Sequence, residues 1–200
     1  MLAWCSLASA EEKATSFPPP DYFVTGGALV AEGAVSSGDV CPSSAENPCI
    51  LGGGGGLAIR AGYRSNADWY LGGAYEFSRH DASNLLVLPI LQQIRFEARR
   101  YFATGTTLEF VLDAGYGLVL YGSEWRADTV GLGGSLGGGI ELQPSPGLIV
   151  GLHLLYRPIL LRGWVDSVGQ DRAGGDGGVG LAHFCGLELV LELQNPLPRW

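Results

Sequence analysis

The 200-residue sequence lacks any hydrophobic run long enough to form a membrane-spanning helix. Such a helix needs about 18 or more consecutive apolar residues, whereas apolar residues here alternate with glycine and charge along the whole chain. Basic residues are also scarce: 12 Lys and Arg stand against 20 Asp and Glu, for a net charge of −8. Because nucleic acids are bound by basic surfaces, this balance argues against a nucleic-acid partner.

Glycine is abundant, with 32 residues, but it does not follow the three-residue period of collagen. Each glycine weakens a helix by about 1 kcal/mol relative to alanine, which disfavours a helical protein. The glycine-rich stretches 52–56 and 131–139 lack the Gly-Lys-Ser/Thr ending of a phosphate-binding loop. A hydrophobic fraction of 46% is too high for a disordered linker. The composition therefore indicates one ordered domain, built from strands.

The first residues resemble an export signal. Residues 1–10 are mostly apolar and end in Ala-Ser-Ala before two glutamates, the pattern of a signal-peptidase site. They lack a positively charged start, so we expect the signal peptide to begin upstream of Met1. We predict a signal peptide over residues 1–10, a linker with three prolines over 11–21, and a single barrel domain over 22–200.

Cysteine usage agrees with export. Cys41 and Cys49 flank a segment rich in proline, serine and asparagine, and a disulfide between them is predicted for an oxidising compartment. The alternative is two free thiols with accidental spacing. No histidine lies near the pair, so the sequence predicts no zinc site, no other metal and no cofactor.

About eight segments show a period of two residues, and each is long enough for the 9 to 11 residues of a tilted membrane-spanning strand. In the clearest, residues 107–120, even positions carry leucine and aromatic side chains, whereas odd positions carry Glu109, Asp113 and glycine. One face is thus apolar and the other small or charged. The eight segments are Tyr22–Val35, Ile50–Arg64, Asp68–Arg79, Leu86–Tyr101, Thr106–Tyr121, Thr129–Leu142, Gly147–Leu161 and Gly178–Leu193.

The connections between these segments alternate in length. Long or polar connections follow the odd-numbered strands and short turns follow the even-numbered ones, so every long connection falls at one end. Outer-membrane barrels have short periplasmic turns and longer outer loops. The serious structural alternative is a soluble lipocalin-like barrel, which also alternates but turns its apolar face inward.

The face rich in glycine and charge suits a narrow, filled barrel interior better than a solvent-facing surface. A turn centred on Thr104 would place Arg99 opposite Glu109 and Arg95 opposite Asp113, as buried charges require. We predict a structural network on this face, with a proton or ion path as the alternative. Its predicted members are Arg60, Glu76, Arg95, Glu97, Arg99, Glu109, Asp113, Glu141, Arg157, Glu188 and Glu192.

Aromatic residues gather near both ends of the segments, where interfacial girdles lie in membrane barrels. We assign two girdles: Tyr63, Trp69, Tyr101 and Phe102 near the turns, and Tyr75, Phe77, Trp125, Tyr156 and Trp164 near the loops.

With Gly186–Leu193 as a last strand and Trp200 as a terminal aromatic residue, the chain resembles the small eight-stranded outer-membrane β-barrels of OmpA/OmpX type. These include the barrel proteins of myxobacterial type. The resemblance covers residues 22–200 and implies an all-β, antiparallel up-and-down barrel in the outer membrane of a Gram-negative-type bacterium. It further implies outer-membrane lipid or lipopolysaccharide and the barrel assembly machinery as partners.

No catalytic residue is predicted, and the expected role is structural, anchoring or surface interaction rather than enzymatic. Two alternatives remain beside the soluble barrel. One is a small pore or lipid conduit. The other is a lipid-directed hydrolase centred on His80 and Asp81, with Ser78 and Ser83 within reach.

Overall fold

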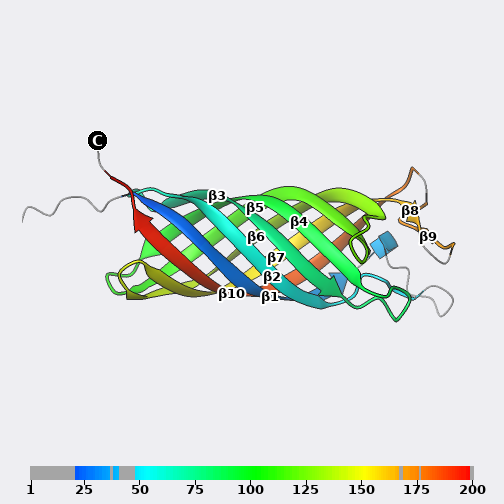
Figure 1. Ribbon diagram of the computed structural model, residues 1–200, viewed down its shortest axis with the longest axis horizontal. Helices are drawn as coiled ribbons and strands as arrows, with labels where there is room; N and C mark the ends of the chain where they lie inside the picture. The colour runs from blue at the N-terminus through cyan, green and yellow to red at the C-terminus, as the bar shows by residue number, and fades with distance from the viewer. Residues whose placement is uncertain (1–20, 37, 41–47, 167–168, 176, 199–200) are drawn as a thin grey trace, which may run out of the picture.

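The chain folds into one closed antiparallel barrel of eight long strands, as the sequence predicted (Figure 1). The computed structural model describes residues 21–36, 38–40, 48–166, 169–175 and 177–198. The barrel strands are β1 (Tyr22–Ser36), β2 (Gly54–Arg64), β3 (Trp69–His80), β4 (Pro89–Ala103), β5 (Leu108–Ser123), β6 (Thr129–Ser145), β7 (Leu148–Arg162) and β10 (Val179–Pro196). Each pairs with its neighbour in sequence, and β1 pairs with β10 to close the barrel.

Two small elements lie in the connections and were not predicted from the sequence. A 3₁₀ turn, η1 (Gly38–Val40), follows β1. A two-stranded hairpin, β8 (Trp164–Val165) with β9 (Asp171–Arg172), lies between β7 and β10. No helix in the described part of the chain is long and apolar enough to cross a membrane.

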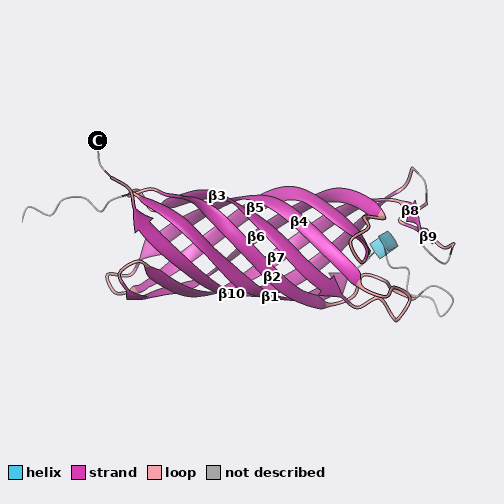
Figure 2. Cartoon of the chain, in the orientation of Figure 1, coloured by secondary structure: helices cyan, strands magenta, loops and turns pink. Residues whose placement is uncertain are grey.

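The two ends of the barrel differ, as predicted. Short turns join β2 to β3, β4 to β5 and β6 to β7, and the end of β10 lies at the same end (Figure 2). The longer connections after β1, β3, β5 and β7 all lie at the opposite end. We call these the turn end and the loop end.

The apolar side chains face outward and the charged ones inward. On β2, which pairs with β1 and β3, Leu57 and Ile59 are 59% and 64% exposed. Arg60 on the same strand is 4% exposed. A soluble barrel would reverse this arrangement, because exposed leucine and isoleucine would face water. The exterior is thus a lipid-facing surface.

For the β4–β5 hairpin, the sequence predicted correctly which side chains face inward, but it predicted the wrong cross-strand pairs. Arg99 pairs with Asp113, and Arg95 pairs with Gly117, so the predicted register is off by four residues. The turn is centred two residues later than Thr104, with Gly105 at a φ of +77° and a hydrogen bond from Thr104 Oγ1 to the Leu108 carbonyl. A shift by an even number keeps each side chain on its face.

Two aromatic residues were wrongly assigned to the girdles. Tyr101 lies on the inward face of β4 and is 1% exposed, and Trp164 is 5% exposed beneath the loops. Trp69 and Phe102 are exposed at the turn end, as expected for a girdle, and Trp125 is exposed at the loop end.

The lipid-facing assignment can be tested by placing a charge in the middle of the exterior. Ile59 lies four residues from Tyr63 of the turn-end girdle, and we expect Ile59→Arg to lower the free energy of unfolding by about 2–4 kcal/mol. The measurement is urea unfolding of the protein in lipid vesicles. The control is Val165→Arg on the exposed β8–β9 hairpin, which we expect to leave stability unchanged. Equal effects of the two substitutions would contradict a lipid-facing Ile59.

Candidate functional site

Inward-facing side chains fill the barrel in three layers. At the turn end, Val24, Tyr70, Tyr101 and Val111 form a buried apolar cluster, which we call the turn-end layer. Tyr70 fits there because its strand neighbours are small: a Cβ on Gly72 would lie 2.1 Å from the Tyr70 hydroxyl oxygen. A larger apolar cluster closes the loop end, and buried charges lie between the two.

We call these buried charges the ion-pair network. Its members are Arg60, Arg95, Arg99 and Arg157 with Glu32, Glu76, Glu97, Asp113, Glu141, Glu188 and Glu192. Their side chains are between 0 and 4% exposed, so they lie almost wholly out of contact with solvent.

Arg99 joins three strands in the half of the network nearer the turn end. Its Nε donates to Asp113 Oδ2 at 3.0 Å, and its Nη1 donates to Glu192 Oε1 at 2.7 Å. Its Nη2 reaches Glu97 Oε2 at 3.4 Å. The guanidinium also lies 4.8 Å from the centre of the Tyr70 ring. Arg99 therefore links the network to the turn-end layer.

Glu188 on β10 is the shared acceptor of the other half. Arg60 Nη2 donates to Glu188 Oε2 at 2.7 Å, and Arg157 and Arg95 both bind Glu188 Oε1. Arg157 Nη1 also donates to Glu32 at 2.6 Å and to Glu76 at 2.8 Å. Each buried carboxylate thus meets charged donors, which is the condition for keeping an ion pair in a low-dielectric interior.

Ten of the eleven residues proposed from the sequence lie in this network, and Glu109 does not. Glu109 lies at the turn-end mouth, where Arg64 Nη2 donates to its carboxylate at 2.8 Å. Sequence reasoning missed Glu32 in the network and Arg64 beside Glu109, and it considered His80 for a hydrolase rather than as a neighbour of Glu32. Glu32 shares the even, inward positions of β1 with Val24, but the weak alternation of β1 hid that signal.

Carboxylates outnumber guanidiniums in this interior. Among the described residues the network holds seven carboxylates and four guanidiniums. Two of those carboxylates lie beside histidines: His80 Nε2 is 3.2 Å from Glu32 Oε2, and His153 Nε2 is 3.1 Å from Glu141 Oε1. Each guanidinium therefore serves several carboxylates, which makes the arginines the scarce partners.

Of the residues considered for a hydrolase, the structure brings His80 and Ser78 together but does not pair His80 with Asp81. His80 Nδ1 lies 2.9 Å from the Gly52 carbonyl, and Nε2 lies 3.0 Å from Ser78 Oγ inside the barrel. Asp81 instead accepts a hydrogen bond from the Ser83 amide at 3.0 Å. Ser78 is 0% exposed, so a lipid outside the barrel does not reach it.

The loop end is covered by a buried apolar cluster, which we call the loop-end layer. It includes Ile50, Leu51, Tyr121 and Trp164, drawn from two loops and the strand ends. The Tyr121 hydroxyl donates to the Ile50 carbonyl. The buried Arg172 of β9 binds Asp166 Oδ2 at 2.9 Å and the Pro48 carbonyl at 3.0 Å. The β7–β10 loop is therefore tied to the β1–β2 loop across the mouth.

Several predictions fall outside the described residues. Residues 1–20, Cys41 and Trp200 are among them, so the signal peptide, the Cys41–Cys49 bridge and a role for Trp200 stay predictions. Cys185 is a free, exposed thiol on the outer face of β10. No group of three or more His, Cys, Asp or Glu side chains in the described chain could hold a metal ion.

The sequence matches no protein-family model and no curated protein sequence. Solved structures do match. Neisserial surface protein A is 17% identical over 86% of this chain and 96% of its own, with a TM-score of 0.55. OprG of Pseudomonas aeruginosa is 10% identical over 90% of this chain and 98% of its own, with a TM-score of 0.52. The chain has the fold of the small eight-stranded outer-membrane barrels, and its lipid-facing exterior agrees with a place in a bacterial outer membrane.

Proposed function

We propose that this outer-membrane barrel is a closed anchor whose activity lies in the loops at its outer mouth. The observation that carries the proposal is the filled interior. The ion-pair network is sealed between the turn-end and loop-end layers, and Arg99, Arg157 and Glu192 are each 0% exposed. A barrel of eight strands is just wide enough for its side chains to fill it.

The loop end supports a role in surface interaction because parts of it are rigidly held. The Asp166–Arg172 pair fixes the β8–β9 hairpin, and Asp128 binds Arg126 within the β5–β6 connection. Glu124 and Asp171 remain exposed on these loops. The surface offered to a partner is thus pre-formed and acidic in part. We include outer-membrane lipid and the barrel assembly machinery among the partners.

The proposal predicts that the barrel does not conduct ions. In planar lipid bilayers at high salt, we expect the folded full chain to give no stepwise conductance, because ions would have to pass two apolar layers and displace buried salt bridges. A porin inserted in the same bilayers is the positive control. Insertion of the barrel itself is checked by its heat-modifiable mobility in gels. Reproducible single-channel steps would favour the pore alternative and overturn the closed anchor.

A further inference from the structure

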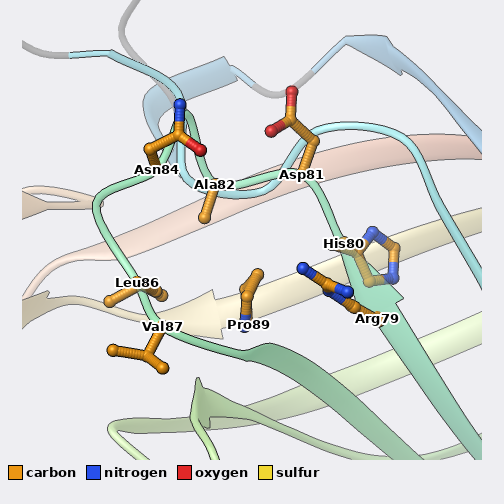
Figure 3. A pocket seen from close by; sticks show the side chains of 8 residues that line it. All are labelled: Arg79, His80, Asp81, Ala82, Asn84, Leu86, Val87 and Pro89. Atoms are coloured by element: carbon orange, nitrogen blue, oxygen red, sulfur yellow. The ribbon is translucent and has the colours of Figure 1, made fainter.

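The β3–β4 loop and the adjoining strand ends line an open pocket at the rim of the loop end. The pocket has a volume of about 420 Å³ and lies between the end of β3 and the start of β4. Figure 3 shows Arg79 at one side, Leu86, Val87 and Pro89 along another, and the Asp81 carboxylate apart from the guanidinium. A positive group thus lies next to an apolar lip, which suits an amphiphilic, anionic ligand.

The loop that forms the pocket is pinned to its neighbours. The amide of Asp81 donates to the Gly53 carbonyl, and the amide of Gly52 donates to the Asp81 carbonyl, both at 2.8 Å. Ser83 Oγ donates to the Cys49 carbonyl at 2.8 Å. Ser83 and Asn84 hold positive φ angles of 51° and 62°, a strained conformation that the surrounding contacts maintain. The pocket is therefore pre-organised rather than shaped by its ligand.

Arg79 is an arginine that lies outside the ion-pair network. It lies on the outward face of β3 and is exposed, and no ion pair or hydrogen bond engages its side chain among the described residues. The neighbouring His80 also lines the pocket, but its ring nitrogens are held by Glu32, Ser78 and the Gly52 carbonyl. A free guanidinium at a concave site is a ready two-pronged donor for a phosphate.

The height of Arg79 on the barrel points to the membrane surface. Arg79 lies ten residues after Trp69 of the turn-end girdle on the same outward face. Ten residues of a tilted strand rise about 25 Å, the height of the apolar band of an outer-membrane barrel. Directly below Arg79 on β3, Phe77 packs against Trp125 with ring centres 5.4 Å apart. This aromatic pair, which we call the aromatic shelf, therefore lies at the edge of the apolar band, where lipid headgroups begin.

We propose that this pocket binds a phosphorylated headgroup of an outer-leaflet lipid. The Arg79 guanidinium holds the phosphate, the Phe77–Trp125 pair contacts the lipid's apolar part, and Leu86 and Val87 form the lip. A free phosphate would use Arg79 alone, whereas the aromatic shelf and apolar lip have no role without acyl chains. The inference rests on the outer-membrane lipid named as a partner in the proposed function and gives it a site, and it holds whether or not the barrel conducts ions.

The test uses the full-length folded barrel in a nonionic detergent with diphosphoryl lipid A as the probe. Native mass spectrometry then measures the bound fraction against lipid concentration. We expect one tightly bound lipid A, and Arg79→Gln should weaken its binding about tenfold, because it removes a charge-assisted pair of hydrogen bonds. Lipid A without phosphates should bind the original barrel with a similar loss. Heat-modifiable gel mobility verifies that each variant is folded.

The matched control is Arg162→Gln, which removes another outward arginine at the loop-end rim, on β7. It should leave lipid A binding unchanged. An equal loss from both substitutions would show general charge attraction and overturn the site, as would unchanged binding after Arg79→Gln. Displacement of lipid A by millimolar inorganic phosphate would show that the pocket takes a free anion and overturn the lipid assignment.

Discussion

Replacing Arg99 by methionine is expected to lower the free energy of unfolding by about 3–5 kcal/mol, because it leaves buried carboxylates without their charge partner. Asp113 and Glu192 would lose hydrogen bonds of 3.0 and 2.7 Å, and both side chains are buried. Methionine keeps much of the side-chain volume, so the charge dominates the effect. Urea unfolding in lipid vesicles, followed by tryptophan fluorescence, measures it.

Two companion variants separate charge from packing. Arg126→Gln removes an arginine whose side chain is 74% exposed, and its expected effect is about 0–1 kcal/mol. Adding Glu192→Gln to Arg99→Met should recover part of the lost stability, because one unpaired carboxylate is then neutral. If the double variant is no more stable than Arg99→Met, the loss comes from packing and the charge argument is wrong.

The surplus of carboxylates adds an asymmetry between the two signs of charge. With seven carboxylates sharing four guanidiniums, neutralising one carboxylate relieves repulsion, whereas removing one guanidinium increases it. Asp113→Asn should therefore cost less stability than Arg99→Met, although the two side chains share one hydrogen bond. The same unfolding measurement compares them.

The faces of the strands were readable from the sequence because a strand's side chains alternate with a period of two. In residues 107–120 this alternation separated the leucine and aromatic side chains from Glu109 and Asp113, and in the structure Phe110 and Leu112 are exposed whereas Asp113 is buried. The alternation of long and short connections likewise fixed which end carries the loops. Both signals are local, so neither depends on how distant strands meet.

The contacts within the interior were not readable in the same way. Arg60 and Glu188 are 128 positions apart and Arg157 and Glu32 are 125 apart, and they meet only because β1 closes on β10. Even the local β4–β5 register was wrong, since period-two alternation does not separate registers that differ by an even number. The pocket at Arg79 depends on loop geometry, which alternation does not describe at all.

Inward glycines are the second feature on which the barrel depends, and we expect Gly117→Val to lower its stability by about 3 kcal/mol or more. A Cβ at Gly117 would lie 1.9 Å from the Ile94 carbonyl oxygen, so β4 or β5 must move. Gly117 is the cross-strand partner of Arg95, whose Nη1 binds Glu76 at 2.6 Å. A shift at this position therefore also disturbs the ion-pair network.

The outward Gly73 provides the matched comparison for Gly117. It also lies within a barrel strand, but its Cβ would be 3.5 Å from the nearest neighbour, the Arg95 carbonyl oxygen, which is ordinary contact. Gly73→Val should leave the unfolding midpoint in lipid vesicles close to that of the original chain, since it adds an apolar group to a lipid-facing surface. If both valine variants lost the same stability, the cost would lie in glycine's strand conformation itself. A loss confined to Gly117 places the constraint in the crowded interior, where strand spacing and charge pairing are set together.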